Sequence, residues 1–183
     1  MPLPCEARHL HRPGHSAPVT PADMAGRVAQ FADLAPDPGD FPDLEDTAHA
    51  RSEWYLLPAQ GLVGEPSPIR APRGFHPAVM RMPQRLRPST HAHPYNKVFM
   101  PLVARCRYCY GNDEAHSVEV GRWGVISVPV GVMRTFASLD VHDAHVLVVF
   151  DTPGDAHTQM LISPRDYESF YKDGWVPGVE ATD

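Results

Sequence analysis

The chain has 183 residues, of which 43% are hydrophobic and 21% are charged, and its formal net charge is −6. This length suits a single domain with a real core, and the negative charge argues against the basic surface that nucleic-acid binding requires. No apolar run is long enough to cross a membrane, and the N-terminus lacks the apolar segment of a signal peptide. We therefore predict a cytoplasmic protein that binds neither nucleic acid nor a membrane.

Residues 1–52 are predicted to form an N-terminal extension made of a Pro- and His-rich arm, one helix over about residues 20–34, and an acidic, Pro-rich loop. Thr20 can cap the helix, and Pro21 suits its first position. The apolar residues at spacings of four and three that would form one stripe along this helix are Met24, Val28 and Phe31.

Residues 53–162 are predicted to form a β domain, because apolar residues alternate with polar ones and Pro and Gly punctuate the chain. The strands are expected near 54–57, 74–82, 97–104, 105–110, 115–120, 123–128, 132–137, 144–150 and 157–162. The segments 97–104 and 105–110 can form one long strand with a bend. Short strands at regular intervals predict an all-β sandwich or barrel.

Residues 163–183 are predicted to form a closing helix and tail, in which Ser163 caps the helix and Pro164 occupies its first position. The three cysteines are too few for a disulfide framework. Cys106 and Cys109 have C-x-x-C spacing, but in a strand they face opposite sides, which favours a packing role over redox or zinc chemistry.

The motif with the most chemical content is His91-Ala92-His93, which is followed closely by an apolar run. In a strand, residues two apart point to the same face and lie about 7 Å apart along the chain. Two imidazoles on one face can converge on Zn, Fe, Ni or Cu. In the alternative interpretation, both histidines contact only water or the backbone.

Residues 74–152 resemble the cupins, which are small β-barrels of the jelly-roll type. His91 and His93 match the paired histidines of the first cupin motif, G-x5-H-x-H-x3,4-E-x6-G, and Pro129-Val130-Gly131 matches the P-x-G turn of the second. The resemblance implies an all-β, cupin-type jelly-roll barrel, here with an N-terminal helix-containing extension and a short C-terminal helix. It also implies a homodimer paired through sheet edges.

Two positions depart from the cupin pattern, in which three histidines and a glutamate hold a divalent metal. The glutamate position falls on Lys97 and the third-histidine position falls on Arg134. Arg cannot deprotonate in a protein and Lys does so only at a large cost, so two cations would oppose the ion. The four-ligand site is absent, although residues 119–136 resemble a branch of bacterial cupins that has Arg at the position of Arg134.

The function that the resemblance favours is a metal-assisted, dioxygenase-type enzyme acting on an anionic or aromatic small molecule. His91 and His93 would hold Fe, Ni, Mn or Zn with a third ligand from elsewhere, for which His145 and His76 are the candidates. Arg134 would then orient the substrate, so that His91, His93 and Arg134 form the predicted catalytic set.

Two other functions stay open. A metal-free cupin of isomerase or cyclase type, or a binding protein, would grip an acidic small molecule through Arg134 and Lys97, with Tyr108 lining the site. A structural or regulatory cupin would have no catalysis. Arg134 can instead form a buried ion pair with an acidic residue, and Lys97 can extend to the barrel rim.

Overall fold

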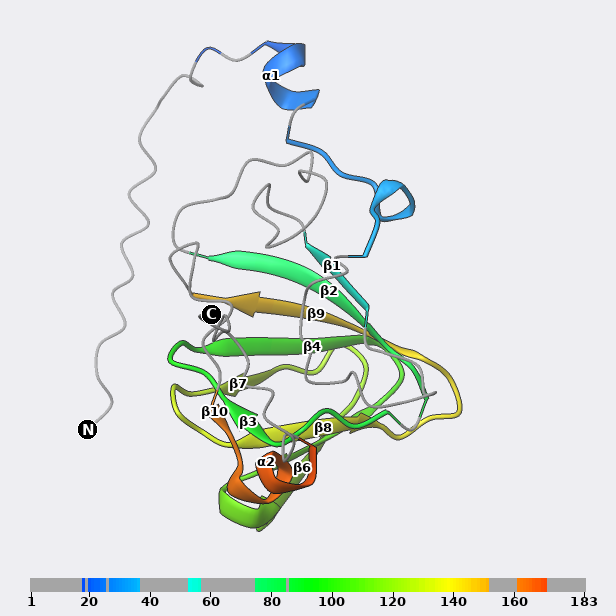
Figure 1. The fold of residues 1–183 in the computed structure, drawn as a ribbon. Helices are drawn as coiled ribbons and strands as arrows, with labels where there is room; N and C mark the ends of the chain where they lie inside the picture. The colour runs from blue at the N-terminus through cyan, green and yellow to red at the C-terminus, as the bar shows by residue number, and fades with distance from the viewer. Residues whose placement is uncertain are drawn as a thin grey trace, which may run out of the picture.

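The computed structural model describes residues 18, 20–25, 27–36, 53–56, 75–84, 86–151 and 161–170. These form two five-stranded antiparallel sheets packed face to face (Figure 1). The strand orders are β1-β2-β9-β4-β7 and β10-β3-β8-β5-β6. The strands are β1 (Glu53–Leu56), β2 (His76–Met82), β3 (His91–Ala92), β4 (Lys97–Val103), β5 (Cys106–Tyr110), β6 (His116–Val120), β7 (Ile126–Val128), β8 (Arg134–Ser138), β9 (Ala144–Phe150) and β10 (Leu161–Ile162).

The core lies between the two sheets, because alternate side chains of β2, β4 and β9 are buried. On β2 the fully buried side chains are Ala78, Met80 and Met82. Phe99 on β4 contacts Tyr108 on β5 and Phe136 on β8, with ring centroids 5.5 Å apart in both pairs. These three rings tie the first sheet to the second, and the predicted all-β fold is confirmed.

One predicted strand divides into two. The segment from Lys97 to Tyr110 forms β4 and β5, which belong to different sheets. Ala104, between them, has φ 70° and is buried. A residue in this left-handed conformation interrupts an extended strand, so the chain crosses from one sheet to the other here.

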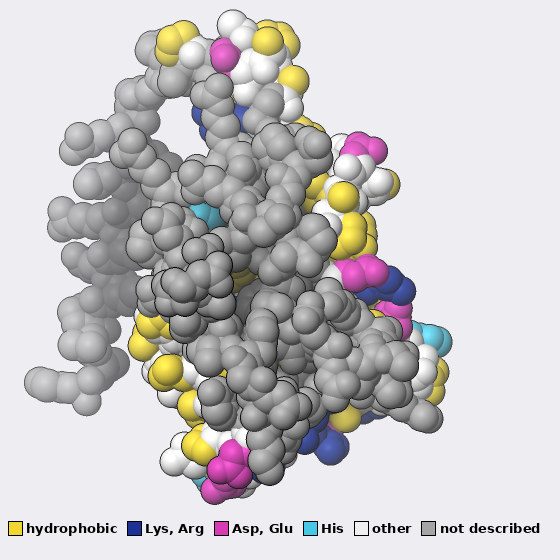
Figure 2. Space-filling model, viewed as in Figure 1, with side chains coloured by type: hydrophobic (Ala, Val, Ile, Leu, Met, Phe, Trp, Pro, Cys, Tyr) yellow, Lys and Arg dark blue, Asp and Glu magenta, His cyan; other side chains and the backbone are white. Residues whose placement is uncertain are grey.

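The predicted helix over residues 20–34 is wrong in length. The structure has α1 (Pro21–Ala25) and a separate 3-10 turn η1 (Phe31–Asp33). The predicted cap is confirmed, because Thr20 Oγ1 accepts a hydrogen bond from the Asp23 amide at 3.1 Å. However, Met24 and Val28 remain about half exposed (48% and 52%), and a helix that buries no face gains little from growing longer. Figure 1 shows α1 apart from the sheets, and Figure 2, in the same view, shows hydrophobic side chains at the surface in this region.

The chain ends, within the described residues, in helix α2 (Pro164–Phe170), beside β10 and β3 (Figure 1). Its predicted cap is confirmed, since Ser163 Oγ accepts a hydrogen bond from the Asp166 amide at 3.2 Å. A further 3-10 turn, η3 (Asn112–Glu114), follows β5. Most of the predicted arm and acidic loop, and the tail after residue 170, lie outside the described residues. No helix in the described part of the chain is long and apolar enough to span a membrane.

Candidate functional site

The two histidines of the H-x-H motif lie inside the barrel. His91 is on β3 and His93 follows it, and their exposed fractions are 4% and 2%. Their ring centroids are 5.0 Å apart with an edge-to-face arrangement. The predicted common direction of the two side chains is therefore confirmed, although β3 itself ends at Ala92.

The protonation state of His91 follows from its contacts. Its Nδ1 lies 2.6 Å from the carbonyl oxygen of Ser89, and a carbonyl only accepts, so Nδ1 carries the proton. Burial, and then the positive charges of Arg134 and Lys97, lower the pKa of His91 well below its usual range. The ring is therefore neutral at pH 7, and Nε2 holds a lone pair that can accept a proton or a hydrogen bond.

Arg134 begins β8 and lies directly opposite His91 in the sheet. Its side chain is 2% exposed, and one terminal nitrogen donates a 2.8 Å hydrogen bond to the His91 carbonyl oxygen. Among the described residues, no group forms a hydrogen bond with its Nε. Burial lowers the pKa of Arg134 to about 10, so the guanidinium is still charged at pH 7. Within the described residues no carboxylate pairs with it, so the predicted alternative of a buried ion pair finds no partner there.

Lys97 also points into the barrel, where only 2% of it is exposed. Its Nζ lies 5.5 Å from the centre of the Tyr95 ring and 5.3 Å from that of Phe150. Both contacts are within the range of a cation–π interaction. The two positions at which the sequence departs from the cupin pattern therefore both face the interior, beside His91.

Tyr108, predicted to line a binding site, is fully buried in the aromatic cluster with Phe99 and Phe136. Its hydroxyl lies beside the Cys106 thiol and makes no well-formed hydrogen bond within the described residues. Burial raises the pKa of Cys106 to about 11, so its thiol is not a nucleophile at pH 7. These contacts give Tyr108 and Cys106 a place in the core, and a binding role for Tyr108 stays a prediction.

His145 does not join the pair, which corrects its prediction as a metal ligand. On β9 the inward positions are Ala144, Val146 and later alternate residues, so His145 faces the outer side of the sheet. There its ring lies 6.1 Å from that of Phe31. His76, the other candidate, is buried and stacks on Phe150 with ring centroids 6.0 Å apart.

The donors that the structure brings together do not fit a divalent ion. Among the described residues, no three His, Cys, Asp or Glu side chains lie where they could hold a metal. The groups beside the two histidines are the cations Lys97 and Arg134, which repel a metal ion and offer no carboxylate.

No protein-family model and no curated protein sequence matches the chain. A solved structure that it resembles is the polyketide cyclase RemF from Streptomyces resistomycificus, at 14% identity and TM-score 0.57, over 78% of this chain and 90% of that one. Oxalate decarboxylase from Lactobacillus farciminis has 11% identity and TM-score 0.52, over 72% of this chain and 34% of that one. The Schizosaccharomyces pombe Cnp3 cupin domain has 13% identity and TM-score 0.44, over 57% of this chain and 67% of that one.

The protein has the cupin fold. At these identities the likeness concerns the fold alone, and this chain spans only about a third of the oxalate decarboxylase. The chemistry of this protein must therefore be argued from its own residues.

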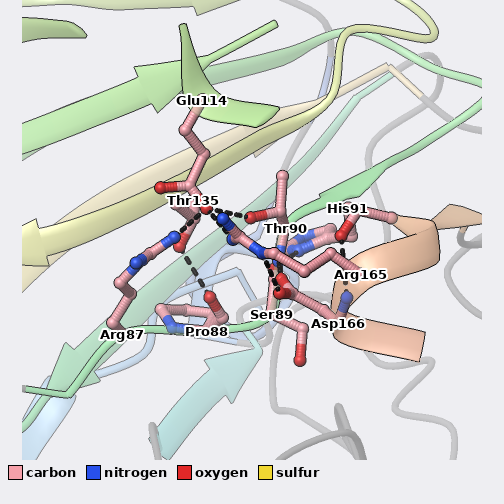
Figure 3. A network of polar contacts seen from close by, with 10 residues as sticks. Arg87, Pro88, Ser89, Thr90, His91, Glu114, Thr135, Arg165 and Asp166 are labelled. Carbon is pink, nitrogen blue, oxygen red and sulfur yellow. Dashed lines mark hydrogen bonds and ion pairs between the residues drawn. The ribbon is translucent and has the colours of Figure 1, made fainter. Parts of the chain in front are cut away.

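Some residues around the site were not predicted. The Ser89 carbonyl sets the tautomer of His91, and Thr90 is held by Glu114 and Asp166 (Figure 3). Every residue has a backbone carbonyl, so no residue type in the sequence indicates that the Ser89 carbonyl accepts this hydrogen bond. Asp166 follows the predicted capping residue Ser163 by three positions, and this spacing says nothing about a contact with β3.

We expect the imidazole of His91 to stay neutral well below pH 6.5 in the folded protein. The unfolded chain takes up that proton near the ordinary pKa of 6.5, so the free energy of unfolding falls as pH drops below this value. NMR titration of the His91 ring and urea unfolding at pH 7 and 5.5 would measure both effects. The pH-dependent loss should shrink in His91→Gln but not in the exposed control His116→Gln, and a His91 pKa near 6.5 would contradict the account.

Proposed function

We propose that this cupin binds an anionic small molecule inside its barrel through Arg134, and acts on it by proton transfer without a metal. The observation that carries the proposal is the buried Arg134 guanidinium, whose Nε has no hydrogen-bond partner in the part of the chain that the structure describes. A buried charge is costly unless it is compensated. A ligand carboxylate or phenolate beside Nε would supply the missing charge and the missing acceptor.

His91 is the group suited to proton transfer in this proposal. Its fixed Nδ1–H leaves Nε2 as the basic atom, and its neutral state at pH 7 allows it to accept a proton from a bound acid. An ammonium at Lys97 and a guanidinium at Arg134 would stabilise the negative charge that develops on the molecule after proton removal. This arrangement favours isomerase- or cyclase-type chemistry.

Metal-assisted oxygenase chemistry, which the sequence favoured, is the alternative. It requires a further ligand, and the described residues bring none to His91 and His93. Metal analysis of protein purified without a His-tag separates the two. We expect a metal content far below one ion per chain that does not change in His91→Ala. Stoichiometric metal that disappears in His91→Ala would favour the oxygenase.

The proposal is tested by calorimetric titration with benzoate, salicylate and gluconate in the presence of EDTA. We expect at least one of these acids to bind saturably, and Arg134→Met to abolish its binding. Arg107→Met is the matched control, because Arg107 lies on β5 with its side chain 48% exposed and pairs with Glu119 at the surface. Binding that EDTA destroys, or that Arg134→Met leaves intact, would exclude the metal-free site. Absence of binding by all three acids would favour the structural or regulatory alternative.

A further inference from the structure

The strand that carries His91 is weakly held by its own sheet. β3 has two residues, and it pairs with β8 only at His91 and with β10 at two positions. Nevertheless Ser89, Thr90 and His91 are all buried. A strand with so few ladder hydrogen bonds needs other contacts to keep one position.

Three side chains and one backbone amide from other segments supply those contacts, and Figure 3 shows the side chains. From β8, Thr135 Oγ1 donates to the Pro88 carbonyl oxygen at 2.6 Å. From η3, Glu114 Oε1 accepts a 2.7 Å hydrogen bond from the Thr90 hydroxyl. From the start of α2, the Asp166 carboxylate accepts the Thr90 amide hydrogen, and the Ser163 amide donates to the Thr90 carbonyl oxygen at 2.7 Å.

Thr90 lies between Ser89 and His91, whose carbonyl oxygens accept hydrogen bonds from the site side chains. The residue before it, Ser89, accepts the Nδ1–H of His91. The residue after it, His91, accepts a hydrogen bond from Arg134 through its carbonyl oxygen. A displacement of Thr90 would therefore change the tautomer of His91 and the hydrogen bond that positions Arg134.

Both the position and the charge of Asp166 suit it to bind the Thr90 amide. It is 7% exposed, its amide is fixed by Ser163, and its carboxylate also accepts a 3.1 Å hydrogen bond from Arg165. Burial acts to raise the pKa of Asp166, but the hydrogen bonds from Thr90 and Arg165 outweigh it and lower the pKa. The carboxylate is therefore ionised at pH 7 and makes a charge-assisted hydrogen bond to the Thr90 amide.

We propose that Asp166 is a positioning residue, which couples the docking of helix α2 to the orientation of His91 and Arg134 inside the barrel. The site is the one described in the proposed function, on which this inference rests. Helix α2, which lies outside the barrel interior, would control that site through Asp166. When α2 is seated, Asp166 and Ser163 hold the backbone of Thr90 on both sides. When α2 leaves, the Nδ1–H of His91 loses its fixed acceptor geometry.

The test uses the whole chain of 183 residues without any ligand, so that its result does not depend on the proposed function. The first readout is the tautomer of the His91 ring from its ¹⁵N shifts, assigned with His91→Gln. The second is hydrogen exchange of the Thr90 amide. The variants are Asp166→Ala and Asp166→Asn, with Glu168→Ala as the matched control, because Glu168 is an exposed acidic residue on the same helix.

We expect wild type and Glu168→Ala to show one His91 tautomer, protonated at Nδ1. In Asp166→Asn a neutral acceptor replaces a charged one, so Thr90 exchange should become about five- to tenfold faster. In Asp166→Ala the His91 ring should show both tautomers while the rest of the spectrum stays folded. If Asp166→Ala does not fold, Asp166→Asn decides alone.

Two results would overturn the proposal. One is an unchanged His91 tautomer together with unchanged Thr90 exchange in a folded Asp166 variant. The other is faster exchange at all amides alike with the His91 tautomer intact, which would give Asp166 a purely structural role. Failure of benzoate, salicylate and gluconate to bind would leave both readouts unaffected, so it would count against the proposed function only.

Discussion

Arg134→Met is expected to make this protein more stable and to abolish anion binding. The guanidinium is 2% exposed, and burial lowers its pKa to about 10, which shows that the charged form is costly where it lies. Replacement of buried charged groups by apolar ones of similar volume often raises stability by about 1–4 kcal/mol. We expect a gain of this size in the free energy of unfolding, reduced by loss of the hydrogen bond to the His91 carbonyl.

Chemical denaturation of wild type, Arg134→Met and the surface control Arg107→Met measures this effect. A gain in stability on substitution is expected of a residue that serves function and destabilises the fold. A loss of about 2 kcal/mol or more in Arg134→Met would mean that Arg134 is a structural residue. The control should change stability by less than about 1 kcal/mol, as expected for an exposed ion pair.

Phe99→Ala is expected to cause a loss of about 3–5 kcal/mol in the free energy of unfolding. The Phe99 ring is 1% exposed and contacts Tyr108 and Phe136, which lie on two strands of the opposite sheet. Its removal takes apolar area from the core and opens a cavity where the two sheets meet. Aromatic pairing adds to the loss beyond buried area.

Guanidinium unfolding of Phe99→Ala against Val103→Ala provides the comparison. Val103 ends the same strand and is 44% exposed, so its truncation should cost less than about 0.5 kcal/mol. A loss below about 1.5 kcal/mol in Phe99→Ala would mean that the three-ring cluster is not the main contact between the sheets.

The strands were predictable because burial on one face leaves a period of two in the sequence. β2 and β9 show it clearly, with alternate residues buried along their whole length. The helix over residues 20–34 was not predictable in length, because a long helix needs a buried apolar face, and Met24 and Val28 of the predicted stripe remain about half exposed. The apolar pattern over Lys97–Tyr110 also did not reveal that the chain passes from one sheet to the other at Ala104. Alanine gives no sign in the sequence of the left-handed backbone conformation that it adopts there.

Part of the site was predictable from the two positions at which the sequence departs from the cupin pattern. Alignment with the cupin pattern placed Lys97 and Arg134 among the candidate groups, and both are buried in the interior. The pattern could not say which face of β9 carries His145. Nor could it show the hydrogen bond between Thr90 and Asp166, since 76 positions separate them and only the folded chain brings them together.

The central claim is that Arg134 Nε is the contact for an anionic ligand in a metal-free site. The most direct measurement is the ¹H–¹⁵N signal of Arg134 Nε, assigned with Arg134→Lys, during titration with benzoate, salicylate and gluconate in EDTA. We predict a saturable shift of this signal with at least one acid, because none of the described residues forms a hydrogen bond with Nε. An Arg134 Nε signal that stays unchanged while an acid binds, or a shift that needs added metal, would contradict the account.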